Sequence, residues 1–335
     1  SGVWNETQKI VASDRDTDDW FGTSVSISGN HAIVGAYQED NDPTGGNTMN
    51  NAGSAYVFER NSSGVWNETQ KIVPSDRATN DLFGIKVSIS GDYLIVGTPR
   101  KQEPPIGGNT MDNAGTAYIF EKNSSGIWSE AQRIVASERT TVDYFGSSVS
   151  ISGEYAIVGA SAEDEDALEG NTLSGAGSAY LFVRNGSGVW SEVQKIVASD
   201  RAASDQFGWS ISISGDYAIV GTPRKQEPPI GGNSMNYAGS AYVFETINAV
   251  EIIENDFGDE LIVFPNPSDG NFSIDLGSFS ESAKISIYDV NGKLIRSESF
   301  DQEQLFNMSI KEPNGLYLMT IILGDKKANI KLIKN

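Results

Sequence analysis

The sequence of 335 residues contains no cysteine and a single histidine, and both shortages restrict its chemistry. Without thiols there can be no disulfide, no thiolate metal ligand and no cysteine nucleophile. Without a second histidine, a nucleophile–base triad lacks a good base. The one histidine, His31, takes a place that is tyrosine in three other copies of a repeated segment, so we interpret it as a packing ring. We therefore expect a protein that is not an enzyme.

Basic residues and long apolar runs are also scarce. The chain has 24 lysines and arginines against 45 aspartates and glutamates, a net charge of −21. Nucleic acids require clustered positive charge, so we expect no nucleic-acid partner. No apolar run approaches the roughly 20 residues of a membrane helix, and we expect no membrane span. The acidic surplus suits an extracellular surface that can attract cations.

A period of 62 residues dominates most of the chain. It separates four tryptophans, Trp4, Trp66, Trp128 and Trp190. It also separates four Phe-Gly pairs, Phe21-Gly22, Phe83-Gly84, Phe145-Gly146 and Phe207-Gly208. A fixed period in this range indicates a solenoid, propeller or array, whose units bury their faces only against neighbours.

Each copy predicts four short strands and no helix. In the first copy these cover residues 3–11, 23–29, 31–36 and 53–60, with apolar and polar residues alternating in the first two. A Gly-Asn pair at 29–30 separates the second and third strands, which predicts a type II′ hairpin turn. The third and fourth strands are joined by a long loop rich in glycine, asparagine and acidic residues.

The fourth of these strands, "SAYVF", is apolar on both faces. Ala55 and Val57 point to one side and Tyr56 and Phe58 to the other, so the sheet needs a neighbour on each face. The second strand carries small serines that suit a crowded position near an axis. Four-stranded sheets packed face to face around an axis form a β-propeller. The predicted fold class is therefore all-β, with four propeller blades of 62 residues.

The order of strands along the chain predicts how the ring closes. The last copy ends near Thr246 without the Trp-containing strand that follows the others, and the chain begins with a spare copy of it, Val3–Val11. We expect this spare strand to complete the fourth blade and close a small ring. An open arc of a larger propeller is the competing prediction.

The motifs "FGxSVSISGxYAIVGA" and "GSAYVF", present in four variants between Val3 and Glu245, resemble the FG-GAP repeat family, the blades of the integrin α-subunit head. The resemblance is closest to the bacterial branch of that family. It implies that Phe-Gly packs where blades meet, beside Gly35-Ala36 in the first copy. Integrin blades that bind calcium carry a DxDxDG-like loop, but here a two-residue turn takes its place. That calcium site should be absent, because Ca²⁺ takes about six to eight oxygens.

The long loops alternate in character, and such loops on a rigid scaffold often carry binding residues. Two are acidic, and their carboxylates are possible Ca²⁺ ligands: Glu39, Asp40, Asp42, Asp164 and Asp166. Two are basic and share the words "TPRKQEPPIGGN", with possible donors to an anionic ligand: Arg100, Lys101, Arg224 and Lys225. The alternative is that all four are solvated loops left by a duplication.

After Glu245 the period stops, and a second pattern begins at Leu261. Alternating strands broken by Asn-Pro, Asp-Gly and Asn-Gly turns predict a small antiparallel β-sandwich. The segments "FPNPSDGNFSI", "IYDVNGKLI" and "NGLYLMTI" closely resemble the C-terminal sorting domain of type IX secretion cargo in the Bacteroidota. That resemblance implies export across the outer membrane. A plain immunoglobulin-like module is the alternative.

The sequence thus predicts a propeller at residues 1–246, a linker at 247–260 and a sorting domain at 261–335. We expect a secreted or surface-displayed module that binds an extracellular protein or glycan, with the type IX machinery as its second partner. Two alternatives are a structural surface protein without a discrete ligand, and the non-catalytic part of a larger secreted polysaccharide-degrading protein.

Overall fold

The computed structural model describes residues 2–46, 48–103, 110–166, 172–230, 233–245, 261–264, 268, 270–276, 282–289, 293–301, 304–313, 315–324 and 326–334. The expected linker, residues 247–260, lies outside these ranges. The chain divides into two units, Ser1–Thr246 and Ile247–Asn335, which we describe separately. In the described ranges, no helix is long and apolar enough to cross a membrane.

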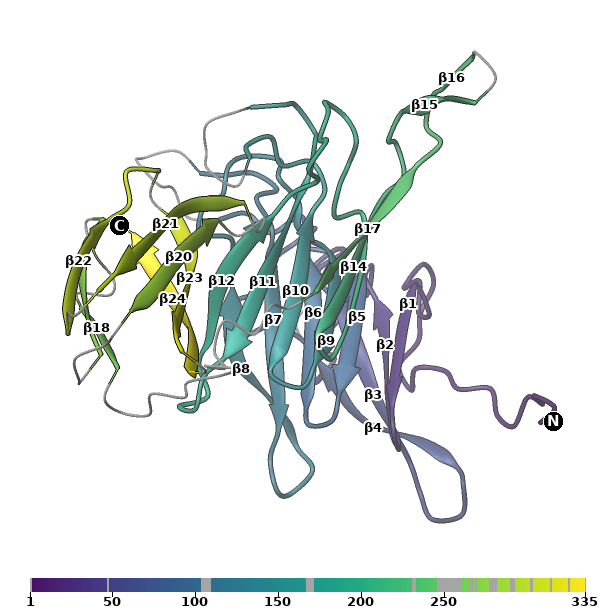
Figure 1. Ribbon diagram of the computed structural model, residues 1–335. Helices are drawn as coiled ribbons and strands as arrows, with labels where there is room; N and C mark the ends of the chain where they lie inside the picture. The colour runs from purple at the N-terminus through teal and green to yellow at the C-terminus, as the bar shows by residue number, and fades with distance from the viewer. Residues whose placement is uncertain are drawn as a thin grey trace. The chain divides into compact units, whose positions relative to one another are not determined.

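The repeats form antiparallel sheets (Figure 1), and each of the first three sheets takes its outer strand from the start of the following 62-residue copy. The first sheet has the order β1 (Ser24–Ser28), β2 (His31–Ala36), β3 (Ser54–Arg60) and β4 (Trp66–Ile72). The second repeats this order with β5 (Lys86–Ser90), β6 (Tyr93–Thr98), β7 (Thr116–Lys122) and β8 (Trp128–Ile134). The third does so with β9 (Phe145–Ser152), β10 (Tyr155–Ala160), β11 (Ser178–Arg184) and β12 (Trp190–Ile196). The all-β repeat prediction is confirmed.

The fourth sheet has three strands, β13 (Ser210–Ser214), β14 (Tyr217–Thr222) and β17 (Ser240–Glu245). A two-stranded hairpin, β15 (Glu227–Ile230) and β16 (Asn233–Met235), interrupts the connection between β14 and β17 and projects away from the sheet (Figure 1).

The turn between the first two strands of each sheet has the predicted geometry. Gly29 has a φ of 58°, and the glycines at the same place in the other copies have φ of 55–57°. The residue after each glycine keeps a negative φ, as a type II′ turn requires.

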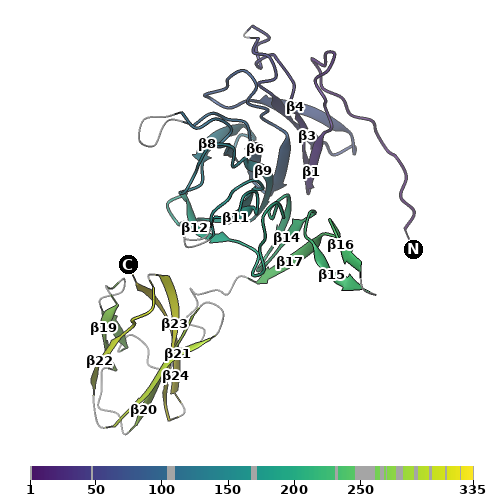
Figure 2. The same cartoon turned by 90° about the horizontal axis from the view of Figure 1, so that it is seen from above.

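The four sheets follow one another around a common centre, each facing the next (Figure 2). Phe83, Phe145 and Phe207 are fully buried, and each ring packs against the tyrosine and phenylalanine of the third strand of its own sheet. At the junctions the backbones touch: a Cβ on Gly97 would lie 2.1 Å from the carbonyl oxygen of Gly146. The small residues therefore set the spacing between neighbouring sheets.

The expected closure of the ring differs from what the structure shows. Residues 3–11 belong to none of the assigned strands, and β17 has β14 as its ladder partner in the described chain. Instead, Gln8 makes two hydrogen bonds with the backbone of Trp66, in the first sheet. The spare strand is held beside the first sheet because Gln8 repeats a contact that Gln70 makes with Trp128 and Gln132 makes with Trp190.

The C-terminal unit is a sandwich of two antiparallel sheets, as predicted. One has the order β18 (Ile262–Phe264), β19 (Asn271–Asp275) and β22 (Leu305–Ser309). The other has the order β21 (Leu294–Phe300), β20 (Ala283–Asp289), β23 (Gly315–Leu323) and β24 (Lys326–Lys334). Their inner faces share one apolar cluster that includes Phe272, Ile285, Phe306 and Met319. This unit therefore has a core of its own.

Candidate ligand-binding loops

Four long connections between the third and fourth predicted strands form the candidate site. They link β2 to β3, β6 to β7, β10 to β11 and β14 to β17. Each is closed at its base by one backbone hydrogen bond in the same place, in which Gly53, Gly115, Gly177 or Gly239 donates to the carbonyl of Glu39, Lys101, Glu163 or Lys225. The loops thus leave the sheets from a common and rigid base.

The acceptor residue in that base alternates between glutamate and lysine. Glu39, Lys101, Glu163 and Lys225 are 62 apart, and their exposed fractions are only 1 to 6%. Reading the loops as separate segments missed this equivalence, although the spacing alone contains it. A buried charge needs a partner of opposite sign, so the two loop types need different neighbours.

In the basic loops the lysine turns inward. The Nζ of Lys101 lies 2.8 Å from Oδ2 of Asp81 and also donates to the carbonyl of Asp76. Lys225 repeats this with Asp205, at 2.9 Å, and with the carbonyl of Asp200. The sequence-based expectation that Lys101 and Lys225 face a ligand is thereby corrected, because buried carboxylates of the same blade bind both ammonium groups.

Arg100 and Arg224, one residue earlier, are exposed. Neither has a polar partner among the described residues. Because the neighbouring lysine and its loop base are fixed, each guanidinium starts from an anchored backbone. These two residues remain candidates for contact with an anionic ligand.

In the acidic loops the buried glutamate takes its cation from the outer strand. Glu163 lies 2.9 Å from Nζ of Lys195 and accepts a hydrogen bond from Ser178. Glu39 accepts one from the hydroxyl of Tyr56 at 2.9 Å and lies 3.3 Å from Nζ of Lys71. Burial raises the pKa of Glu163 to about 7, despite its lysine. An acid already paired with an ammonium group is a poor metal ligand.

The other predicted metal ligands hold the loops together. Asp40 and Asp164 accept backbone hydrogen bonds across their loops, each at 2.7 Å, and Asp42 accepts from the Thr44 hydroxyl at 2.7 Å. Asp166 is half-buried near the edge of the described part of its loop. The described ranges contain no group of three or more acidic or histidine side chains placed for a metal ion. The predicted calcium set is therefore not brought together.

The aspartate two residues before each Phe-Gly pair is buried in all four copies. Asp143 accepts a hydrogen bond from the Thr140 hydroxyl at 2.8 Å, whereas Asp81 and Asp205 also bind the loop lysines. Burial raises the pKa of Asp143 to about 6. These carboxylates cap turns, and only the basic loops supply a lysine to neutralise them.

His31 packs as the sequence suggested. Its ring lies edge-on to Trp128 with 6.1 Å between ring centres, and Tyr93 meets Trp190 in the same way at 5.7 Å. Burial is the main cause that lowers the pKa of His31, and the positive charge of Lys122 lowers it further. The imidazole is thus a neutral part of a blade junction.

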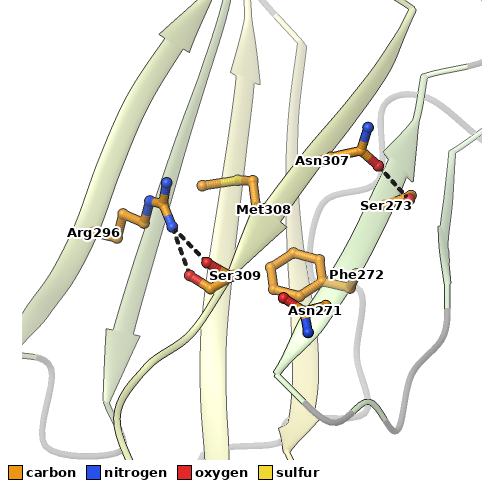
Figure 3. Close-up of a pocket in the computed structure, with 7 residues that line it drawn as sticks. All are labelled: Asn271, Phe272, Ser273, Arg296, Asn307, Met308 and Ser309. Carbon is orange, nitrogen blue, oxygen red and sulfur yellow. Dashed lines mark hydrogen bonds between the residues drawn. The ribbon is translucent and has the colours of Figure 1, made fainter.

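The C-terminal unit has a shallow hollow of about 430 Å³ (Figure 3). It is lined by Asn271, Phe272, Ser273, Arg296, Asn307, Met308 and Ser309. The Arg296 guanidinium donates to the carbonyl of Ser309 at 2.7 Å and to Glu298, so its charge is already matched. The hollow offers short polar side chains and no unpaired charge from Arg296.

Comparisons with known proteins agree with the two units. A family described as FG-GAP repeat matches residues 4–58, 66–120, 128–182 and 190–244, and one described as Secretion system C-terminal sorting domain matches residues 262–335. No curated protein matches the chain. The solved structure of sucrose-6-phosphate hydrolase from Lactobacillus gasseri is similar at 10% identity, over 96% of this chain and 75% of that chain, with a TM-score of 0.32. So low a TM-score supports no functional argument.

Proposed function

Because the chain belongs to the FG-GAP repeat family and carries a secretion-system sorting domain, we propose that it is a non-catalytic binding module displayed outside the cell. The sorting domain assigns the protein to type IX secretion and hence to the medium or the outer-membrane surface. The proposed ligand is an extracellular protein or glycan that presents carboxylate or other anionic groups to the loops.

The observation that carries this proposal is the exposure of Arg100 and Arg224 beside two buried lysines. In a chain of net charge −21, a free guanidinium is attracted to the protein's own carboxylates. Here the buried carboxylates Asp81 and Asp205 are already bound by the lysines next to these arginines. The arginines therefore stay available to a partner.

The chemistry of such a contact is direct. A guanidinium can donate two parallel hydrogen bonds to one carboxylate, which gives both orientation and strength. Two copies of the same basic loop, two blades apart, would engage a ligand with repeated anionic groups more tightly than one copy. Binding of this kind weakens as salt rises, because exposed charges are screened.

The test is capture of soluble glycans and extracellular proteins on an array by the immobilised full chain, in calcium and then in chelator. We expect saturable capture that survives chelation and falls at least tenfold in the Arg100→Ala/Arg224→Ala variant. The matched control is Arg60→Ala/Lys86→Ala, which removes two exposed positive charges from strands.

Capture lost on chelation would overturn the arginine contact and favour the acidic loops. Equal capture by both double variants would overturn it as well. A chain that captures nothing would favour the alternative of a structural surface protein.

A further inference from the structure

The first blade leaves uncovered a sheet face that later blades bury. Val87 and Ile89, on the first strand of the second blade, are each 5% exposed. Their counterparts in the first blade, Val25 and Ile27, are 68% and 65% exposed. This is the face that a preceding blade would cover, and we call it the head face.

The fourth blade leaves the opposite face uncovered. Ile33 and Val57 of the first blade are fully buried, in one apolar cluster with Val87. Their counterparts in the fourth blade, Ile219 and Val243, are 45% and 69% exposed. We call this the tail face. Head and tail faces are thus the two halves of the contact that joins each internal pair of blades.

The polar part of the junction is also divided between the two ends. Ser24, Ser26 and Ser28 accept hydrogen bonds from the backbone N–H groups of Val87, Ile89 and Gly91, at 3.0 to 3.1 Å. The second and third of these contacts recur at both later junctions, where Ser88, Ser90, Ser150 and Ser152 are the acceptors. In the fourth blade the equivalent serines, Ser210, Ser212 and Ser214, are exposed and point to no following blade in this chain.

The N-terminal segment, residues 3–11, lies where the outer strand of a preceding blade belongs. The Gln8 side chain donates a hydrogen bond to the Trp66 carbonyl at 2.7 Å and accepts one from the Trp66 backbone N–H at 2.8 Å. Gln70, in the outer strand β4, makes the same two hydrogen bonds with the backbone of Trp128, at 2.7 and 2.9 Å. Yet Trp4 is fully exposed, whereas Trp128 is 3% exposed. The segment thus makes the glutamine contact of an outer strand but pairs with no sheet in the described structure.

The fourth blade lacks the strand that this segment represents. In the first blade β3 pairs with the outer strand β4, with Val57 opposite Gln70 and Glu59 opposite Asn67. Shifted by the repeat, that register places Val243 opposite Gln8 and Glu245 opposite Asn5. Figure 2 shows β17 at one end of the series of sheets and β1 at the other.

The two partners of an aromatic contact between blades are also found at opposite ends of the series of sheets. At the first two internal junctions the ring that opens the second strand packs against a tryptophan of the next blade, His31 against Trp128 and Tyr93 against Trp190. In the fourth blade the equivalent ring, Tyr217, is 56% exposed. The tryptophan that would receive it is Trp66, which is half-buried in the first blade.

We propose that two copies of this chain associate head to tail, with residues 3–11 of one copy entering the fourth blade of the other as its outer strand. The head face of the first copy then covers the tail face of the second. The junction has the kinds of contact found at the internal ones: valine and isoleucine against isoleucine and valine, serine hydroxyls against backbone N–H groups, and Trp66 against Tyr217.

A second copy is the partner that the structure supports, because this chain itself carries both halves of the contact. Adding a strand to an open edge is a common mode of recognition, and the join is heterologous, so two joins can close a pair. Such a pair has eight blades, within the range of roughly four to eight found in propellers.

A disulfide can read the register directly, because the chain has no cysteine of its own. Residues directly opposite on antiparallel strands have Cα atoms about 4.5–5.5 Å apart, which a disulfide can span. We expect the full-length Asn5→Cys/Glu245→Cys variant to give a covalent dimer on a denaturing gel, which reductant converts to monomer. The control is Asn5→Cys/Glu59→Cys, because the strand opposite Glu59 is already in place.

A cross-linked monomer would overturn the proposal in favour of closure within one chain. Equal dimer yields from the variant and its control would overturn it too, since random collision would explain both.

The mass of the protein in solution gives an independent test. At about 100 µM, a hundredfold above a micromolar Kd, we expect light scattering to report more than the 36.0 kDa monomer. Val25→Lys and Val243→Lys should each lower that mass, and an equimolar mixture of the two should stop at pairs, because one intact head meets one intact tail. Val189→Lys is the control, since valine or isoleucine at that place is exposed in every copy. A monomer at this concentration would overturn the proposal.

Discussion

At the scale of single residues, the neighbouring pair Arg100 and Lys101 separates a structural charge from an available one. The two residues have the same sign and adjacent places, yet one is exposed and the other is bound by Asp81. A buried ion pair that loses one partner leaves an uncompensated charge, which is costly. The two positions should therefore respond very differently to substitution.

We predict that Lys101→Ala lowers the free energy of unfolding by about 3 kcal/mol, because Asp81 would remain buried without its cation. Arg100→Ala should stay within about 0.5 kcal/mol of the natural chain, as exposed substitutions usually do. Urea unfolding followed by tryptophan fluorescence measures both. Equal losses in the two variants would contradict the assignment of Lys101 to the interior.

We predict that Asp143 makes the protein less stable as pH rises from about 4 to 7. Its folded pKa is about 6, above the ordinary 3.8, so in this window the folded chain holds a proton that the unfolded chain has released. Stability is therefore lost with rising pH, by at most about 3 kcal/mol. Asp143→Asn should gain stability relative to the natural chain over that window, measured by urea unfolding at each pH. Asp42→Asn, in an exposed turn, is the control, and equal gains by both would refute the prediction.

At the scale of elements, backbone groups of neighbouring blades come into direct contact beside the packed side chains. Gly97 faces the carbonyl oxygen of Gly146, and the N–H of Phe145 donates to the carbonyl of Ala114 at 2.9 Å. A side chain at such a place would separate the sheets. At the equivalent glycine of the fourth blade, Gly221, the three atoms nearest to an added Cβ all belong to Ser210 of the same blade.

We predict that Gly97→Ala lowers the free energy of unfolding by about 3 kcal/mol, because its Cβ would overlap a backbone oxygen that cannot rotate away. Gly221→Ala should cost much less, because the closest atom is the rotatable hydroxyl of Ser210. Thermal unfolding of both variants at low protein concentration tests the comparison. Similar losses would show that these glycines do not set the blade spacing.

The sequence predicted the elements well and the loop chemistry poorly. Strands, turns and junction glycines recur every 62 residues. A strand or turn that is uncertain in one copy can therefore be assigned from the same positions in the other three. The inward turn of Lys101 could not be read from "RK", because only burial separates the two residues. The fate of Val3–Val11 was also undetermined, since the pattern identifies an outer strand without saying which blade receives it.

At the scale of the whole molecule, the chain has two units with separate cores, the repeats and the sorting domain. The repeats bury three of their four Phe-Gly pairs, and the C-terminal sandwich buries its own cluster around Phe306. Removing one unit should therefore leave the other folded, as expected of independent domains.

We predict that deleting residues 261–335 leaves the repeats folded but retained inside a bacterium with type IX secretion. Export depends on the sorting domain, whereas folding of the repeats does not. Cell-surface labelling and fractionation measure location, and protease resistance of the retained chain measures folding. Surface display of the truncated chain at the level of the full chain would refute the role of the tail.

The serine contacts between blades have a consequence for how such a protein can lengthen over evolutionary time. The hydroxyls of Ser24, Ser26 and Ser28 accept from N–H groups that every amino acid except proline possesses. A duplicated segment thus fits beside any earlier copy without matching substitutions. The sequences at 98–109 and 222–233 are identical and lie 124 residues apart. Tandem gene duplication of a pair of repeats would produce this pattern, and further duplications would change the number of repeats.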